Sequence, residues 1–146
     1  MDREYKRAII LENYQNPHNK GLIDDDSYCK ISTNSKSCID QIDLQLKIED
    51  GIVKDIRFDG EACAICTSST SILINIIVGK KIEEALNIID NFENMINEKE
   101  YDEKLLEEAI VYSDISKQPN RKKCATLTWE GVKKNLIGGT TNEFKI

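Results

Sequence analysis

Three separate parts of the sequence carry side chains able to bind a metal ion or attack sulfur: Cys38 with Asp40, Cys63, and Cys124. A cysteine thiolate is both a zinc ligand and the nucleophile of sulfur chemistry. In Cys38-Ile39-Asp40 the thiol and the carboxylate are two residues apart, so an extended backbone directs both to the same side. With Cys63 and Cys124, they would complete the three sulfurs and one oxygen that zinc accepts in a tetrahedral site.

Cys63 has the most informative local context. The apolar run of residues 52–58 is soon followed by a glycine and then by a predicted helix that carries Cys63 and Cys66 in its first turn. The unpaired N–H groups and partial positive charge of a helix N-terminus favour a thiolate there. The pair also forms a C-x-x-C, a pattern typical of thiol–disulfide oxidoreductases. A third interpretation is that Cys63, Cys66 and Cys124 are small buried hydrophobic residues, and spacing alone leaves all three interpretations open.

The segments that must position these residues predict an α+β fold. Apolar and polar residues alternate over 41–49, which indicates a half-buried strand, and a turn at Glu49-Asp50-Gly51 leads into a partner strand over 52–58. Residues 28–33 are a third candidate strand. The prediction is a small antiparallel sheet of about three strands packed by helices. A tight hairpin needs antiparallel strands, which argues against a thioredoxin-like oxidoreductase built from parallel βαβ units.

Five helices are predicted, over residues 3–15, 67–78, 82–97, 102–112 and 122–137. In the first, Tyr5, Ala8, Ile9 and Leu11 are the expected inward positions. The run 67–78 is β-branched, but its small polar opening and the glycine after it favour a helix.

The loops around these helices carry fewer candidates for chemistry. His18 lies among turn-forming residues and is predicted to be a turn residue rather than a metal ligand. Residues 140–146 are predicted to be a frayed tail.

Composition limits the classes of function. A chain of 146 residues with 40% hydrophobic content can form one domain, 1–146, with a core that needs no metal staple. The net charge of -6 argues against nucleic acid or an anionic membrane as partner and favours a basic protein. The charged N-terminus and the absence of a long apolar run predict a cytoplasmic protein. Its five cysteines are then expected to be free, metal-bound or catalytic.

Four motifs resemble, in order, the signatures of the NifU N-terminal and IscU-like family: Asn16-Pro17-His18-Asn19-Lys20-Gly21, Cys38-x-Asp40, Phe58-x-Gly60-x-x-Cys63-Ala64-Ile65 and Arg121-x-x-Cys124-Ala125-x-Leu127-x-Trp129. The resemblance implies an iron–sulfur cluster assembly protein whose antiparallel sheet is packed by helices. The SufU branch is the more similar one, because Lys123 stands where Isc-type scaffolds have histidine and residues 98–118 add helical sequence.

Members of the SufU branch bind zinc through three cysteines and an aspartate and accept persulfide sulfur from a SufS-type cysteine desulfurase. The resemblance therefore implies zinc ligands Cys38, Asp40, Cys63 and Cys124, with Cys38 as the sulfur acceptor and downstream Suf assembly proteins as further partners. Arg121, one turn before Cys124, would pair with a site thiolate or a partner carboxylate. The alternative within the family is a scaffold that binds iron and assembles a [2Fe-2S] cluster on the same cysteines.

Two residues depart from the family pattern. Ile39 replaces the usual glycine, which predicts a stiffer C-x-D loop. Cys66 replaces the usual serine, and it could be a bystander, a spare ligand or a disulfide partner.

Overall fold

The computed structural model describes residues 2–34 and 40–139, so Cys38, Ile39 and the predicted tail lie outside the described residues. The elements in chain order are α1 (Arg3–Gln15), β1 (Cys29–Asn34), β2 (Gln41–Glu49), β3 (Ile52–Glu61), α2 (Ala64–Ile77), α3 (Ile82–Ile96), α4 (Glu103–Leu106), the 3-10 helix η1 (Glu107–Lys117) and α5 (Pro119–Gly139).

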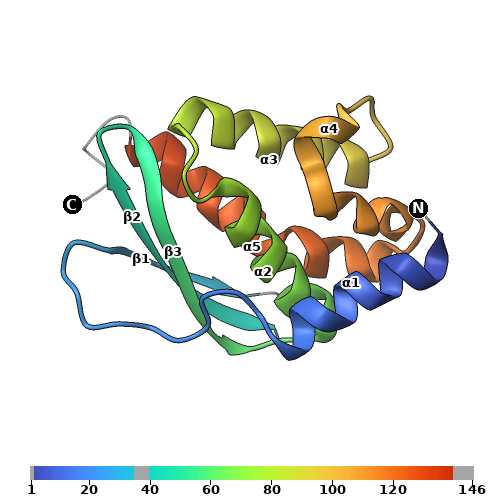
Figure 1. Ribbon diagram of the computed structural model, residues 1–146, viewed down its shortest axis with the longest axis horizontal. Coiled ribbons are helices and arrows are strands. Elements are labelled where there is room, and N and C mark those ends of the chain that lie inside the picture. The colour runs from blue at the N-terminus through green and yellow to red at the C-terminus, as the bar shows by residue number, and fades with distance from the viewer. Residues whose placement is uncertain (1, 35–39, 140–146) are drawn as a thin grey trace.

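The three strands form one antiparallel sheet in the order β1-β2-β3, which confirms the predicted α+β fold class. The helices gather on one side of this sheet, with α2 and α5 nearest to the strands (Figure 1). Ile42, Leu44 and Leu46 of β2 are buried, as their alternation predicts. The core therefore lies between the sheet and the helices.

The segment between α1 and β1 runs along the sheet and covers polar groups there. Gln45 is buried although it alternates with the core residues, because its side-chain amide donates to Ile23 O at 2.7 Å and accepts from Ile23 N at 2.9 Å. Gly21 N donates to Phe58 O at 2.6 Å, and Phe58 N donates to Asn19 O at 3.2 Å. The Asn16–Gly21 motif thus supports β3, and His18 lies in a turn, as predicted.

Helix α2 confirms the choice of helix over strand for the β-branched run, although it begins at Ala64 rather than residue 67. Its polar residues Thr67 to Ser71 are buried, yet their hydroxyl groups have partners on other helices or along the chain. Four of these hydroxyl groups bond to other helices: Ser68 with Tyr112 of η1, Ser69 with Ala125 O and Thr70 with Thr128 of α5, and Ser71 with Asn13 of α1. Buried hydroxyls with partners avoid the cost of desolvation and fix the position of α2.

Two expectations about the other helices are wrong. Residues 102–112 are not one α-helix: α4 ends at Leu106, Glu107 has a left-handed φ of 45°, and the chain continues as η1. In α1 the residues Tyr5, Ala8 and Leu11 are exposed, whereas Ile9 packs against the core as expected, and the fully buried residue is Asn13. The core meets only a narrow strip of α1, where Asn13 accepts the hydrogen bond from α2.

Candidate metal centre

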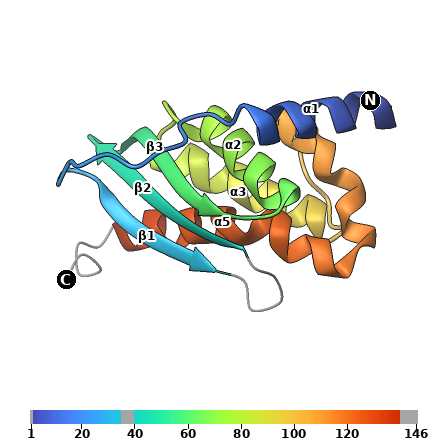
Figure 2. The same cartoon turned by 90° about the horizontal axis from the view of Figure 1, so that it is seen from below.

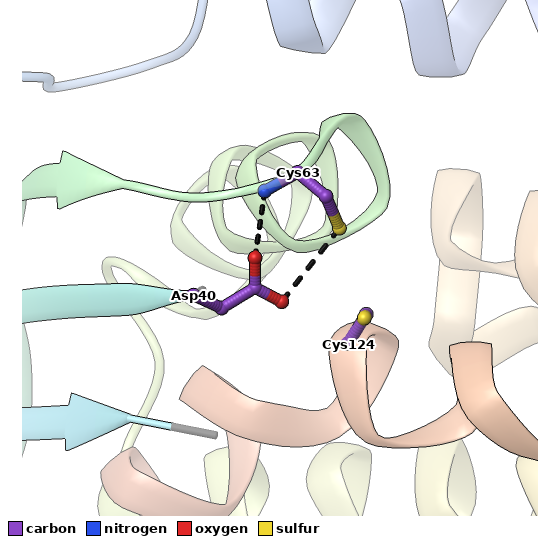
Figure 3. Close-up of side chains that lie close together, drawn as sticks. All are labelled: Asp40, Cys63 and Cys124. Carbon is purple, nitrogen blue, oxygen red and sulfur yellow. Dashed lines mark hydrogen bonds between the residues drawn. The ribbon is translucent and has the colours of Figure 1, made fainter. Parts of the chain in front are cut away.

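Three of the predicted site residues meet where their elements begin. Asp40 immediately precedes β2, Cys63 immediately precedes α2, and Cys124 lies near the start of α5. Figure 3 shows the three side chains converging on one point from these elements. Their candidate ligand atoms, one carboxylate oxygen and two sulfurs, all lie within 4.8 Å of one another.

Asp40 and Cys63 are held together by a hydrogen bond between the Cys63 backbone N–H and the Asp40 side chain. The Cys63 N–H donates to Asp40 Oδ1 at 2.7 Å, and Cys63 Sγ lies 3.7 Å from Asp40 Oδ2. Asp40 is only 1% exposed. A buried carboxylate that accepts a backbone N–H and faces a thiol is well placed as a hard ligand beside a soft one.

The Cys63 side chain also caps α2. Its sulfur accepts the Cys66 N–H at 3.4 Å, the position that a serine or threonine oxygen usually occupies at a helix N-cap. The predicted helix N-terminus is therefore present, with Cys63 as its cap and Cys66 in its first turn.

Gly60 brings the strands close together next to the site. It pairs with Ile42 and has a φ of +140°, and a Cβ at this position would lie 2.1 Å from Gln41 O. Only a glycine permits this approach. Since Asp40 precedes Gln41 and Cys63 follows Glu61, the tight pairing of these strand ends brings carboxylate and thiol together.

Cys124 is positioned by the packing of α5 against α2. It is 1% exposed, and its sulfur lies 3.7 Å from Asn120 O. Ser69 Oγ donates to Ala125 O at 2.6 Å and accepts the Trp129 indole N–H at 2.8 Å. The helix that starts at Cys63 and the helix that carries Cys124 are thus bonded to each other next to the site.

The donor set fits zinc in chemistry and in size. Metal–sulfur bonds of about 2.3 Å at tetrahedral angles place two sulfur ligands about 3.8 Å apart. Ligand atoms within 4.8 Å of one another need only small side-chain rotations to reach that separation. Cys38, the predicted fourth ligand, lies outside the described residues.

The remaining candidates take different positions. Cys66 is fully buried in the core and is not part of the group of convergent ligand atoms. Arg121 is exposed and lines a cleft together with Cys63. This cleft was not predicted from the sequence, although Arg3, Lys6 and Arg7 have the i, i+3, i+4 spacing that places three cations on one helix face.

A cluster of two thiols and a carboxylate beside one end of a three-stranded antiparallel sheet defines a class of small α+β proteins with a candidate metal site. The chain belongs to one family of this class, the NifU-like N terminal domain family, which residues 4–130 match.

The chain is similar both to a sulfurtransferase and to a cluster assembly scaffold. The chain is 38% identical to the zinc-dependent sulfurtransferase SufU of Bacillus subtilis, over 89% of this chain and 88% of that protein. It is 37% identical to the iron–sulfur cluster assembly scaffold protein IscU of Thermotoga maritima, over 90% of this chain and 92% of that protein.

Solved structures agree on the fold. The crystal structure of FiSufU from Fervidobacterium islandicum AW-1, described as an assembly scaffold for the SUF system, is similar with a TM-score of 0.80 and 31% identity. That match covers 88% of this chain and 93% of FiSufU. A NifU-like protein from Brucella abortus shares the fold at 22% identity and a TM-score of 0.80, over 96% of this chain and 100% of that one. Within residues 2–34 and 40–139, no helix is both long and apolar enough to cross a bilayer.

Proposed function

We propose that this chain is a single-domain, zinc-dependent sulfur acceptor in iron–sulfur cluster assembly, supplied by a SufS-type cysteine desulfurase. The observation that carries the proposal is the convergence of Asp40, Cys63 and Cys124 within ligand distance of one another. The similarity to a zinc-dependent sulfurtransferase over most of both chains supports it.

The ligands assigned by this proposal are Asp40, Cys63, Cys124 and, from the family resemblance, Cys38. A bound zinc ion would keep these cysteines deprotonated at neutral pH and protect them from oxidation. Two hydrogen bonds support this assignment, because they keep three of the proposed ligands close together: the Cys63 N–H donates to Asp40, and Ser69 donates to Ala125 O of α5.

Cys38 is the proposed acceptor. Its thiolate attacks the outer sulfur of the donor persulfide, a new S–S bond forms on Cys38, and the old S–S bond breaks to release the donor cysteine as a thiolate. Arg121 lies one helical turn before Cys124, and its guanidinium is proposed to pair with a thiolate or with a carboxylate of the partner.

A cluster scaffold remains the second candidate, because the IscU of Thermotoga maritima is almost as similar as the SufU of Bacillus subtilis. Sulfur transfer is favoured by Lys123, where Isc-type scaffolds have histidine. The structure does not support a dithiol oxidoreductase: Cys66 is fully buried, and the strands of the described sheet are antiparallel.

The experiment is to measure alanine release by a matching cysteine desulfurase with and without this chain, alongside its zinc content. The wild-type chain is expected to raise alanine release, because it removes the persulfide that otherwise stays on the enzyme. Cys38→Ser is expected to abolish the stimulation, since serine cannot hold a persulfide. A wild-type chain that binds zinc but gives no stimulation, while assembling a stable cluster from iron and sulfide, would overturn sulfur transfer in favour of the scaffold.

A further inference from the structure

A cleft of about 670 Å³ opens beside Cys63, between α1, the start of α2, η1 and the start of α5. These elements lie beside α1, along the side that carries Arg3 to Ile10 (Figures 1 and 2). Five cationic side chains line the cleft: Arg3, Lys6 and Arg7 of α1, Lys117 of η1, and Arg121 of α5. This concentration of positive charge contrasts with the net charge of -6 for the whole chain.

Asp114 is the one carboxylate residue in the lining. It is already paired, because Lys6 Nζ lies 2.9 Å from its Oδ2 and also 3.0 Å from Ser113 Oγ. The hydrogen bond from Lys6 holds the pKa of Asp114 below its usual value. Among the ion pairs of the described residues, none involves the other four cations.

Apart from Gln118, the lining between these cations is apolar. Ile10, Ile65, Val111 and Ile115 lie between the charged residues, and Cys63 and Ala64 border the same cleft. Cations flanking an apolar surface are complementary to a peptide whose carboxylates flank an apolar side chain.

We propose that this cleft is the docking site for an acidic segment of the desulfurase that delivers sulfur, an inference that rests on the proposed function. The composition predicts a basic partner, but the Debye length at physiological ionic strength is only about 8 Å. Charges at the contact therefore outweigh the net charge of distant surfaces. An acidic segment held in the cleft brings the rest of the partner up to the Cys63 side of the site.

The test compares two double charge reversals. Arg7→Glu with Lys117→Glu removes exposed cations of the cleft, and Lys30→Glu with Lys54→Glu makes the same change in net charge at exposed strand positions away from it. The measurement is the concentration of this chain that gives half-maximal stimulation of alanine release, at low and high salt, with zinc content and melting temperature recorded.

The cleft variant is expected to raise the half-maximal concentration at least about tenfold at low salt, because close charge complementarity governs association. The strand variant is expected to change it less than about twofold. Salt should weaken wild-type binding and have little effect on the cleft variant. Equal behaviour of the two variants, with wild-type stimulation intact, would overturn the inference and leave the proposed function standing.

A second assay does not depend on sulfur transfer. A fluorescent peptide of alternating glutamate and leucine is titrated with wild-type protein and with both variants, and inorganic phosphate serves as competitor. Binding that only the cleft variant loses supports the proposal even if the desulfurase is never stimulated. Phosphate binding without peptide binding would make the cleft a small-anion site and overturn it.

Discussion

Cys63 links the fold to the chemistry of the site through one sulfur atom. Its thiol caps α2 by accepting the Cys66 N–H, lies 3.7 Å from Asp40 Oδ2, and belongs to the ligand group with Cys124. A serine can replace it as a cap but not as a soft ligand, so the two roles can be separated by substitution.

The wild-type chain is expected to bind about one zinc ion, and Cys63→Ser is expected to lose it, yet to retain the cap of α2. Cys63→Ala should lose both. Without metal, the alanine variant should be less stable than the serine variant by about 0.5–2 kcal/mol, the usual cost of losing an N-cap. Elemental analysis of the purified proteins measures the zinc content, and urea denaturation of the metal-free proteins measures the loss of stability.

The zinc contents of Cys124→Ser and Cys38→Ser are compared with that of Cys63→Ser. Both should lose the metal, since removal of one ligand from a four-ligand site weakens binding severely. Zinc at the wild-type level in all three serine variants would disprove the assigned site.

Cys66→Ser is expected to keep its zinc, because Cys66 is fully buried in the core and lies outside the convergent ligand atoms. A serine hydroxyl in that position is expected to lower the free energy of unfolding, while the backbone N–H of residue 66 still donates to Cys63 Sγ. Zinc content and alanine release of the variant check this. Loss of zinc in a variant that remains folded would make Cys66 a ligand.

At the scale of elements, α2 is fixed by hydroxyl groups rather than by apolar side chains alone. Ser69 is the central one, since it donates to Ala125 O and accepts the buried indole N–H of Trp129. Through this residue, the helix that begins at Cys63 is aligned with the helix that carries Cys124.

Ser69→Ala is therefore expected to reduce the free energy of unfolding by about 1–3 kcal/mol, because the Trp129 N–H is left buried without its acceptor. It should also weaken zinc binding, since α2 and α5 lose their bond beside the site. Ser32→Ala is the matched control: Ser32 is exposed on β1, donates to Asp43 Oδ1 at 2.9 Å, and its loss should change stability by less than about 0.5 kcal/mol. Urea denaturation and zinc titration measure both variants. Equal effects of Ser69→Ala and Ser32→Ala would contradict the prediction.

Local patterns predict the regular elements well because alternation and helical spacing report burial directly. Residues 41–49 and the β-branched run of α2 follow their patterns. The single helix over 102–112 was wrong because a left-handed residue, Glu107, ends α4, and nothing in local propensity demands that break. The predicted inward positions of α1 were also mostly wrong, because the residues of α1 that face the core depend on where α2 lies in the fold.

Part of the site could be predicted and part could not. Residue chemistry and family resemblance indicated Asp40, Cys63 and Cys124 as partners, and the structure brings them together. The hydrogen bond from the Cys63 N–H to Asp40 depends on the start of β2 lying beside the end of β3, and no spacing in the sequence specifies that pairing. Likewise, the cationic cleft joins α1 to residues more than a hundred positions later.

The whole molecule has a core that does not depend on the metal site. A stacked pair, Phe92 and Trp129, with ring centroids 3.8 Å apart, lies among buried side chains of the sheet and helices. Lys133 of α5 bridges Asp90 and Glu93 of α3, each at 2.9 Å. The candidate ligands Asp40, Cys63 and Cys124 lie at one end of this core.

Removal of zinc by a chelator is therefore expected to lower the melting temperature by about 5 °C or more, because the metal stabilises only the folded state. The helical circular dichroism signal should persist at room temperature. Unfolding of the chain on chelation would show instead that the metal holds the fold together.

Gly60 sets the distance between two candidate ligands, the oxygen of Asp40 and the sulfur of Cys63. With a Cβ only 2.1 Å from Gln41 O, any side chain at position 60 must push β3 away from β2, and Cys63 moves away from Asp40 with it. Gly60→Ala changes no ligand, yet it should shift the relative affinity from zinc towards a larger thiophilic ion such as cadmium. Competition titrations of the two ions against wild-type and variant protein measure that shift. An unchanged ratio would mean that ion size is selected elsewhere in the site.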